Sequence, residues 1–364
     1  MIFIKNKKSL IFTDIHWGKS RDSQNKVESN IKTIKWIISL IKEHDITDVF
    51  FLGDWFDDRN SINVKTSMHA RESLIALAEL AQIYMIVGNH DAYFKNTIDV
   101  HSLAVYEGIK NVHIIDKITE FDLLGNTCAL YPWDTFNKSI DSSFDIIMGH
   151  FEWEGAVYVP NSTIVGNVQH YNGDDLTTVA PIVFSGHYHI RKEYSYKNGK
   201  VYSVGCPLQL DWGDYKNPKG CFILNNSTLD FEFIPNPVAP TYIKIYYSEY
   251  KKKKPELKNI VKDNYVRLVI DSDYEFSDIV DLISKVNSYS PVKPCETDYT
   301  FNNLVADDVE TTNTCDEHEQ ELVNINTFEA VKKFVDMNPN FINDSESDII
   351  LQTFKNYFDS VSKK

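Results

Sequence analysis

Cysteine is scarce in this sequence and follows no recognisable pattern. The 364 residues contain only five cysteines, and no two of them form a Cys-x-x-Cys pair. They are Cys128, Cys206, Cys221, Cys295 and Cys315. An odd number of scattered cysteines argues against a disulfide framework or a zinc knuckle, and it fits a reducing compartment.

Long apolar segments are also missing. No apolar run approaches the roughly 20 residues that a membrane-spanning helix needs. The N-terminal stretch MIFIKNKKSLIF has neither the long apolar core nor the small-residue cleavage site of a secretory signal peptide. We therefore expect no membrane association and a cytoplasmic location, in the host cytoplasm if the source is viral.

Positive charge is in short supply. The chain has 37 Lys and Arg residues against 52 Asp and Glu residues, for a formal net charge of -15. This balance excludes binding of nucleic acid by overall charge alone, but it leaves room for a local basic groove or for a partner that supplies one. No Lys or Arg occurs between Lys293 and Lys332, so residues 293–326 are predicted to form an acidic, flexible linker.

Apolar residues are plentiful and are arranged as strands and helices. Hydrophobic residues make up 43% of the chain, which is enough for a substantial core. Helix-like segments at about residues 24–44 and 64–81 separate short apolar runs of the kind found in strands buried on both faces. This alternation predicts βαβ units and a largely parallel sheet.

Five of the apolar runs end in side chains that commonly bind metal ions. They end at Asp14 and His16, at Asp54, at Asn89, His90 and Asp91, at His150, and at His187 and His189. In parallel sheets, ligands collect beyond the carboxyl ends of the strands, and Asp and Asn are seldom buried without partners. Glycine precedes four of the five groups, which permits a tight turn and a close approach of the backbone to a ligand. The endings together predict one shared site.

The stretch SGHYH, at residues 185–189, shows how the interpretation depends on context. By itself, His-x-His is explained more readily by two structural side chains than by two ligands. As the last of five strand endings it favours ligands. If the chain is extended there, positions two apart project to the same side, so both rings would face the site with Tyr188 turned away.

The chemistry of the ligand set indicates what is bound. It combines carboxylates, imidazoles and one amide oxygen without a thiolate, which suits divalent Mn, Fe or Zn better than a structural zinc site. Even seven of these nine side chains would be too many ligands for a single ion that keeps an open position. Two ions that share a carboxylate fit better, and such a pair, about 3.5–4 Å apart, can clamp a phosphate for in-line attack.

The order of the motifs, D-x-H, G-D, G-N-H-D, G-H and G-H-x-H, resembles that of the calcineurin-like metallophosphoesterase superfamily over about residues 8–234. The resemblance implies an α/β fold, in which two sheets form a sandwich flanked by helices, and an enzyme that hydrolyses phosphate esters. It also implies two divalent metal ions, Mn2+ in the first place with Mg2+ as the alternative.

The resemblance further implies a role for each motif position. One metal ion is expected to bind Asp14, His16, Asp54 and His189, and the other to bind Asp54, Asn89, His150 and His187. His90 matches the family histidine that donates to the phosphate or protonates the leaving oxygen instead of binding metal. Asp91 would orient that histidine.

Three longer segments resemble the SbcD-like double-strand-break repair nucleases within that superfamily. They are DIHWGK at residues 14–19, GDWFDDRN at residues 53–60 and VYSVGCPLQLDWGD at residues 201–214. Three positions depart from the pattern, one of which is Trp212, near the usual aromatic position. Cys206 stands where the family has Ser, and Asp57 stands where some relatives have His, so Asp57 is left out of the predicted catalytic set.

Closely spaced prolines after residue 234 mark a domain boundary. We expect a nuclease domain at residues 1–234. A small α/β domain, which in the resembling family caps the site and helps admit DNA, is expected at residues 241–292. The run of lysines at residues 251–254 is either a solvated loop or a patch that contacts phosphate.

The last part of the chain, residues 327–364, is predicted to be a helical segment. Apolar residues of its final helix follow one stripe, namely Ile350, Phe354, Tyr357, Phe358 and Val361. The stripe packs either on the chain's own body or on a partner, and its position after an acidic linker favours a partner. The resemblance implies an SbcC-like coiled-coil ABC-type ATPase, DNA as the substrate, and a homodimer of this chain within a heterotetramer.

The leading hypothesis is a Mn2+-dependent DNA nuclease subunit of recombination and double-strand-break repair. It would act as an exonuclease on duplex ends and as an endonuclease on single strands or hairpins. A general phosphodiesterase or nucleotide phosphoesterase is the alternative within the superfamily, although such an enzyme would not need the C-terminal helices. A scaffold subunit with an inactive phosphoesterase fold is the non-enzymatic alternative, which the intact ligand set disfavours.

Overall fold

The computed structural model describes residues 1–137, 143–159, 162–163 and 171–299. All of them belong to one compact unit, Met1–Asn302. The predicted helical segment with its apolar stripe and nearly all of the predicted acidic linker lie outside the described residues. Within the described part of the chain, no helix is both long enough and apolar enough to cross a membrane.

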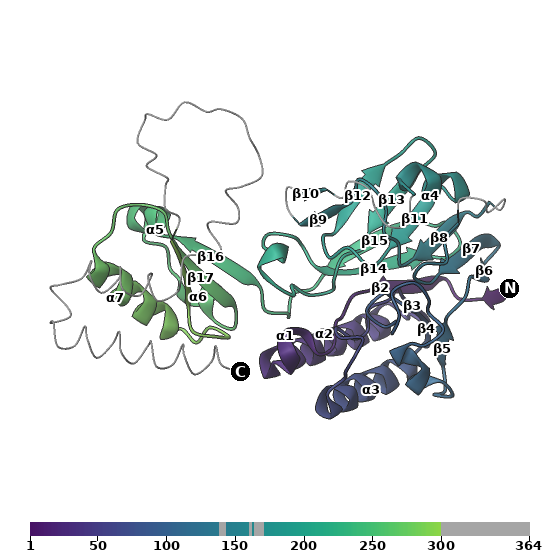
Figure 1. The fold of residues 1–364 in the computed structure, drawn as a ribbon, viewed down its shortest axis with the longest axis horizontal. Helices are drawn as coiled ribbons and strands as arrows, with labels where there is room; N and C mark the ends of the chain where they lie inside the picture. Colours follow the sequence, from purple (N-terminus) through teal and green to yellow (C-terminus); the bar gives the residue numbers. More distant parts are fainter. Residues whose placement is uncertain (138–142, 160–161, 164–170, 300–364) are drawn as a thin grey trace, which may run out of the picture. The chain divides into compact units, whose positions relative to one another are not determined.

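The first large sheet has six strands in the order β15-β14-β2-β3-β4-β5 (Figure 1). They are β2 (Lys8–Phe12), β3 (Asp48–Phe51), β4 (Gln82–Ile86), β5 (Val112–Ile115), β14 (Gly220–Asn225) and β15 (Phe231–Pro235). Strands β2 to β5 run parallel, whereas β14 is antiparallel to both β2 and β15. The parallel arrangement predicted from the alternation of strands and helices is therefore present.

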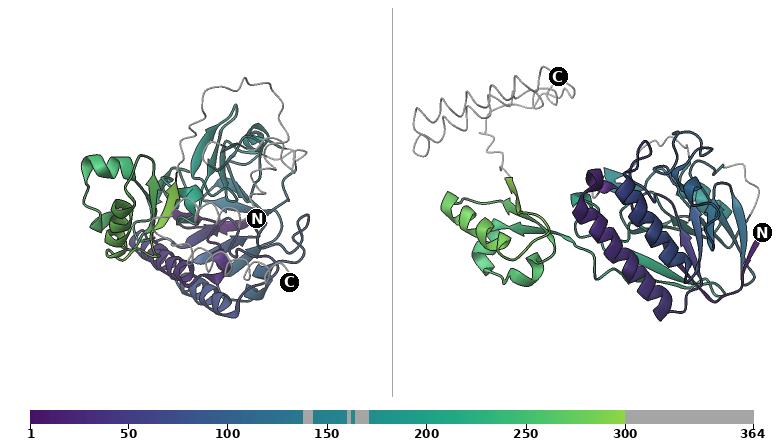
Figure 2. Two further views of the ribbon diagram at one scale, coloured as in Figure 1. Left: turned by 60° about the vertical axis from the view of Figure 1, so that its left-hand side comes forward. Right: turned by 90° about the horizontal axis from the view of Figure 1, so that it is seen from below.

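Helices α2 (Gln24–Glu43) and α3 (Val64–Ala78) connect the parallel strands and lie side by side against one face of this sheet (Figure 2). Their bounds agree closely with the predicted segments, although α3 ends before residue 81. The side chain of Asn63 accepts a hydrogen bond from the backbone N–H of Lys65 and so caps the start of α3. A short turn, α1 (Lys19–Asp22), precedes α2, and the 3₁₀ helix η1 (Ser102–Tyr106) precedes β5.

The second large sheet has seven strands in the order β1-β6-β7-β8-β11-β13-β12. They are β1 (Ile2–Ile4), β6 (Thr119–Leu123), β7 (Asn126–Tyr131), β8 (Ile146–Gly149), β11 (Ile182–Ser185), β12 (Lys192–Ser195) and β13 (Lys200–Ser203). Helix α4 (Gly173–Val179) covers its outer face, where Leu176 packs with Val183 of β11. The ribbon of β9 (Val157–Val159) and β10 (Ser162–Thr163) and the 3₁₀ helix η2 (Trp212–Asp214) lie in the connections.

Strand side chains alternate between two hydrophobic clusters. In β2, Leu10 and Phe12 belong to the cluster beneath α2 and α3, whereas Ile11 belongs to the cluster between the two sheets. In β3, Phe50 packs between the sheets against Tyr84 of β4. Because successive side chains of a strand point to opposite faces, a continuous apolar run is required where both faces are covered. The predicted fold class, an α/β sandwich of two sheets flanked by helices, is confirmed.

Residues 241–299 form a small α/β region with three parallel strands. Its elements are β16 (Tyr242–Tyr246), α5 (Tyr247–Lys253), α6 (Lys258–Val261), β17 (Tyr265–Ile270), α7 (Phe276–Asn287) and β18 (Glu296–Tyr299). Strand β18 lies beyond residue 292, where the sequence predicts the linker to begin, and its pairing with β17 extends regular structure to Tyr299. Residues 251–253 of the lysine run form the last turn of α5, where the helix dipole favours positive charge.

Candidate metal centre

The polar side chains that follow β2, β3, β4, β8 and β11 lie together at the carboxyl ends of these strands. Six of them form two groups, and within each group the nitrogen and oxygen atoms that could bind a metal lie within 4.8 Å of one another. One group is Asp14, His16 and His189, and the other is Asp54, His150 and His187. His16 belongs to a third such group, together with Asp57 and His90. The fold thus brings together residues that come from both sheets and from distant parts of the chain.

In the first group, the ring nitrogens of two histidines face each other. The Nε2 atom of His189 lies 3.1 Å from Nε2 of His16. The same nitrogen of His16 lies 3.7 Å from Oδ1 of Asp14 and 3.7 Å from Oδ2 of Asp54. The side chains of His16, Asp14 and Asp54 are buried. Imidazole nitrogens and carboxylate oxygens therefore point into one small space, an arrangement that suits a cation.

In the second group, an amide oxygen lies between two histidines. Oδ1 of Asn89 lies 2.8 Å from Nε2 of His150 and 2.9 Å from Nδ1 of His187. Oδ2 of Asp54 lies 3.4 Å from the same nitrogen of His150. Because this oxygen also faces His16, a single atom of Asp54 is shared by the two groups.

Contacts on the far side of the rings fix which nitrogen of each histidine faces the site. Nδ1 of His150 lies 2.7 Å from the carbonyl oxygen of Leu52. Because a carbonyl oxygen can only accept, Nδ1 carries the hydrogen, and in the neutral ring Nε2 has the free lone pair. Nδ1 of His16 lies 3.2 Å from Oδ1 of Asp57, which orients its ring in the same way. Second contacts of this kind are typical of metal-binding histidines.

The buried carboxylates require positive charge beside them. Burial disfavours the charged form of His16. The carboxylates of Asp14 and Asp57 outweigh this effect of burial and raise the pKa of His16 to about 10. Burial also opposes the charging of His150, but the charge of Asp54 outweighs it and raises the pKa of His150 to about 9. A proton on each of these two rings meets the requirement, and a divalent cation meets it equally well.

Four of the site residues have left-handed backbone conformations. The angle φ is 52° at Asp14, 48° at His16, 61° at Asp54 and 83° at His187. Each such residue costs about 1–2 kcal/mol, so the surrounding structure must hold it in place. Backbone hydrogen bonds join the turns after β2 and β3, from Asp14 to Gly53 at 3.0 Å and from His16 to Asp54 at 3.2 Å. Strain held in this way is often found at functional sites.

Two glycines allow the turns to approach each other. Gly53 has a φ of +99°, and a Cβ atom there would lie 2.4 Å from Nδ1 of His150. A Cβ atom at Gly88 would lie 2.3 Å from Oδ1 of Asp54. At both positions the missing side chain lets the backbone approach a side chain of the candidate site.

Residues 185–189 depart from the extended conformation assumed for them. Strand β11 ends at Ser185, and His187 has a left-handed backbone, so the expectation of an extended chain here is wrong. Both rings still face the site, because the turn carries His187 to Asn89 and His189 to His16.

Tyr188, between the two histidines, is turned away from the site as predicted. It is buried in the cluster outside the second sheet, and its ring centroid lies 4.9 Å from that of Trp153.

Burial lowers the pKa of His187 and of His189 to about 3, and the positive charge of a neighbouring imidazole contributes to each shift. These two rings are therefore neutral near pH 7.

His90 and Asp91 have separate environments, in contrast to the predicted pairing. Nδ1 of His90 lies 2.5 Å from the carbonyl oxygen of Asp57, and the backbone N–H of His90 donates to Oδ1 of Asp54 at 2.8 Å. The carboxylate of Asp91 accepts backbone N–H groups at 2.9–3.3 Å, those of Asp54, Trp55, Phe56 and Gly88. Asp91 thus holds the turn after β3, and the ring of His90 is oriented by the backbone of Asp57 instead.

Asp57, which the prediction left out, contacts the site directly. Besides His16, its carboxylate contacts Nζ of Lys19 at 3.3 Å. Positive charge from both neighbours outweighs burial and lowers the pKa of Asp57. Its position inside the GDWFDDRN motif is the signal that could have identified it, because it follows Asp54 by three residues.

Two further residues at the site carry no local sequence signal. The ring centroid of Trp133 lies 5.1 Å from that of His187. The ammonium group of Lys219 donates to the carbonyl oxygen of His189 and pairs with the buried carboxylate of Asp214 at 2.5 Å. Both residues come from connections between strands, so only the folded chain shows that they support the two histidines of SGHYH.

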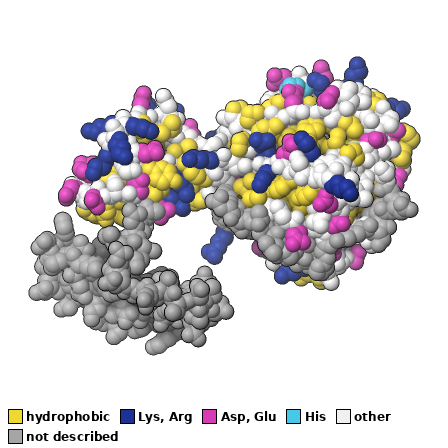
Figure 3. All heavy atoms as spheres, turned by 90° about the horizontal axis from the view of Figure 1, so that it is seen from above, with side chains coloured by type: hydrophobic (Ala, Val, Ile, Leu, Met, Phe, Trp, Pro, Cys, Tyr) yellow, Lys and Arg dark blue, Asp and Glu magenta, His cyan; other side chains and the backbone are white. Residues whose placement is uncertain are grey.

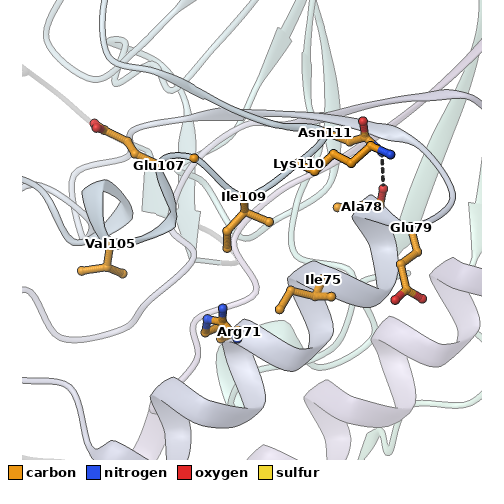
Figure 4. A pocket seen from close by; sticks show the side chains of 10 residues that line it. Arg71, Ile75, Ala78, Glu79, Val105, Glu107, Ile109, Lys110 and Asn111 are labelled. Atoms are coloured by element: carbon orange, nitrogen blue, oxygen red, sulfur yellow. Dashed lines mark hydrogen bonds between the residues drawn. The ribbon is translucent and has the colours of Figure 1, made fainter.

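A cavity of about 640 Å³ lies away from these residues, between α3 and the segment that follows η1 (Figure 4). Arg71 and Ile75 line it from α3, and Ile109 lines it from the opposite side. The amide of Asn111 donates to the carbonyl oxygen of Ala78 at 2.8 Å. Its lining offers carboxylate and amide oxygens but no histidine, so it lacks the imidazoles found at the metal centre.

Residues 7–191 match the family described as calcineurin-like phosphoesterase. This match covers more than half of the chain, so the chain belongs to that family, and the resemblance seen in its motifs is confirmed. Exonuclease subunit 1 of Enterobacteria phage T4 is 31% identical over 238 residues, which make up 63% of this chain and 68% of the phage protein. The structure described as that of a novel archaeal phosphodiesterase aligns with 63% of this chain and 99% of its own, at 13% identity and a TM-score of 0.35.

Replacing Asp91 tests whether it supports the backbone or orients His90. Asp91→Ala removes the acceptor for several buried N–H groups, each of which costs about 1–3 kcal/mol when unpaired. We expect the free energy of unfolding in urea to fall by at least about 3 kcal/mol, and by less for Asp91→Asn, which keeps one acceptor oxygen. Asp99→Ala, at an exposed position of the same loop, is the control. Lost activity with unchanged stability would instead support the orienting role.

Proposed function

We propose that this chain is a DNA nuclease subunit that hydrolyses phosphodiester bonds with two divalent metal ions, preferably Mn2+. It acts as an exonuclease on duplex ends and as an endonuclease on single strands or hairpins. The observation that carries the proposal is the single oxygen of Asp54 that faces two groups of ligand atoms, which suits two ions sharing one carboxylate. Family membership supports phosphoester hydrolysis, and similarity to a phage exonuclease subunit supports DNA as the substrate.

The proposed ligands fall into two sets, and each set includes one of the observed groups. One ion is assigned to Asp14, His16, Asp54 and His189, and the other to Asp54, Asn89, His150 and His187. Carboxylate, imidazole and amide donors without thiolate suit Mn2+. When bound, such ions polarise the phosphate and lower the pKa of water. The chain's own part is to hold the donors in place, which the contacts of Leu52, Asp57 and Lys219 support.

His90 is proposed to act on the phosphate itself. Its Nδ1–H donates to the carbonyl oxygen of Asp57, so Nε2 is the free nitrogen. Only when the ring is an imidazolium does Nε2 carry a proton that it can give to a phosphate oxygen or to the leaving oxygen. Its ring packs edge-on against that of His16, with centroids 4.9 Å apart, which places it beside the first group of ligands. Asp91 contributes indirectly, by holding the turn that carries Asp54.

We propose that a partner assists DNA binding, namely an SbcC-like coiled-coil ABC-type ATPase in a heterotetramer with two copies of this chain. The net charge of -15 supports the need for outside contacts to DNA, and the similar phage protein is itself called a subunit. Residues 1–234 are assigned to the nuclease and residues 241–292, as predicted from the sequence, to a cap that helps admit DNA. Pairing of β18 with β17 adds residues up to Tyr299 to the same region. Residues 327–364, after the acidic linker, are proposed to bind the ATPase through the apolar stripe of Ile350, Phe354, Tyr357, Phe358 and Val361.

The proposed activity is tested on matched substrates. Purified protein with Mn2+ is given a linear duplex, a single-stranded oligonucleotide, a hairpin and bis(p-nitrophenyl) phosphate as a small diester. We expect a higher kcat/KM on DNA than on the small diester, and stimulation by the partner ATPase. Cleavage of the small diester alone, with or without the ATPase, would reject the DNA nuclease in favour of the general phosphodiesterase.

Two variants separate metal binding from proton donation. Asp54→Ala removes the shared carboxylate, so we expect loss of both bound metal, measured by elemental analysis after reconstitution with Mn2+, and cleavage. His90→Gln removes no proposed ligand, so we expect retained metal and a kcat lower by about 100- to 10,000-fold. His69→Gln, on α3, is the control for the histidine replacement. Undiminished cleavage by either site variant would contradict the assignment.

Asp57 is expected to tune the affinity for metal through His16. Replacement of the group that orients a ligating histidine typically weakens metal binding by about 10- to 100-fold. We therefore expect Asp57→Asn to raise the dissociation constant for Mn2+ by that factor in a calorimetric titration at constant pH. Asp58→Asn, at the exposed neighbouring position, is the matched control. Equal affinities of the two variants would show that the contact between Asp57 and His16 has no effect on metal binding.

A further inference from the structure

Two neighbouring aromatic rings are exposed in the loop that follows the GNHD motif. Tyr93 is 50% exposed and Phe94 is 47% exposed, and their rings contact each other edge to face with centroids 4.9 Å apart. We propose that this pair, called here the aromatic platform, stacks against unpaired bases of the strand that is cut. The inference rests on the proposed nuclease function and deepens it, because it makes unpaired strands and opened duplex ends the preferred substrate.

Contacts of the loop place the platform beside the metal centre. The residue after Phe94 is Lys95, whose carbonyl oxygen accepts a hydrogen bond from Nε1 of Trp133 at 3.4 Å. The ring of Trp133 in turn packs against that of His187, with centroids 5.1 Å apart. Only the side chain of Trp133 therefore separates the loop from His187 of the candidate site. A strand held at the site would thus pass close to the platform.

The loop is held at its base, so its rings are presented on a fixed support. Ala92 and His101 form an antiparallel bridge, and the backbone N–H of Tyr93 donates to the carbonyl oxygen of Val100 at 2.8 Å. The backbone N–H of Ser102 donates to the carbonyl oxygen of Asp91 at 2.8 Å. A fixed loop loses little conformational freedom when a ligand binds, which favours binding.

A cavity of about 250 Å³ adjoins the platform and has the charge that a nucleic acid requires. Tyr93 and Val100 line one side, and Arg59 and Ile62 come from the segment after β3. Its lining includes Arg59 and no carboxylate. A phosphate next to a stacked base would thus meet a cation and apolar surface, while Lys95 offers a second cation in the same loop.

Stacking is the contact that an acidic protein can best use to hold a strand. On the face shown in Figure 3, Lys and Arg side chains lie interspersed with Asp and Glu side chains and form no continuous basic surface. Stacking of bases on aromatic rings tolerates any sequence and does not depend on net charge. In a duplex the base faces are covered by their neighbours, so only unpaired bases are free to stack on the platform.

The test compares substrates with the full-length double variant Tyr93→Ala/Phe94→Ala in Mn2+. We expect KM for a single-stranded oligonucleotide to rise at least about 10-fold, while kcat/KM for bis(p-nitrophenyl) phosphate stays within about twofold of wild type. The salt dependence of KM should not change, because no charge is removed. Tyr93→Phe should retain most of the wild-type KM, and Phe3→Ala, an exposed aromatic position on β1, is the matched control.

Three results would overturn the inference. Equal losses on the oligonucleotide and on the small diester would show a structural effect on the site. A loss that appears only with the partner ATPase present would make the platform a protein-docking surface. If the wild-type protein cleaves DNA and the double variant has the same KM for the oligonucleotide, the platform is rejected and the nuclease function stands. If the wild-type protein cleaves no DNA, both are rejected.

Discussion

The buried carboxylate of Asp54 is the group on which the other site residues depend. Its Oδ2 faces His16 after the first sheet and His150 after the second, and its Oδ1 accepts the backbone N–H of His90. Burial would raise the pKa of Asp54, but the positive charge of His150 outweighs it and holds the pKa well below its usual value. An unpaired charge at this depth would cost several kcal/mol. Residues at the carboxyl ends of both sheets thus surround one anion.

The backbone around Asp54 is shaped by the same requirement. Asp54 has a left-handed backbone conformation. Asp91 accepts hydrogen bonds from backbone N–H groups of the same turn, and Gly88 has no side chain to collide with the carboxylate. Together these features place one carboxylate between two turns. None of these features stabilises the fold by itself, since left-handed residues and buried anions both carry a cost. The packed clusters on both faces of each sheet supply the stability that offsets these costs.

The sequence predicted which polar side chains come together at the strand ends, because each of them follows an apolar run and usually a glycine. The same local reasoning failed for Asp91, which adjoins His90 in sequence but reaches the N–H of Asp54, 37 positions earlier. Strand β18 was missed because its four residues, ETDY, are mostly exposed at the edge of a sheet and show no apolar pattern. The left-handed turn at His187 was missed because a histidine gives no sign of such a conformation. Contacts across long separations and unusual backbone conformations are what local patterns do not contain.

The proposed metal ions would also change how this acidic chain would bind its proposed DNA substrate. Two divalent ions bring four positive charges to a centre with two carboxylate ligands, Asp14 and Asp54, so the loaded centre would be positive although the chain carries a net charge of -15. A phosphate would then be drawn to the centre itself, and little long-range attraction would remain for the rest of the strand. Contacts that do not depend on charge, such as the base stacking proposed for Tyr93 and Phe94, would have to hold the neighbouring nucleotides. Because base pairs open most readily at the end of a duplex, such contacts would direct the enzyme to ends without any recognition of sequence.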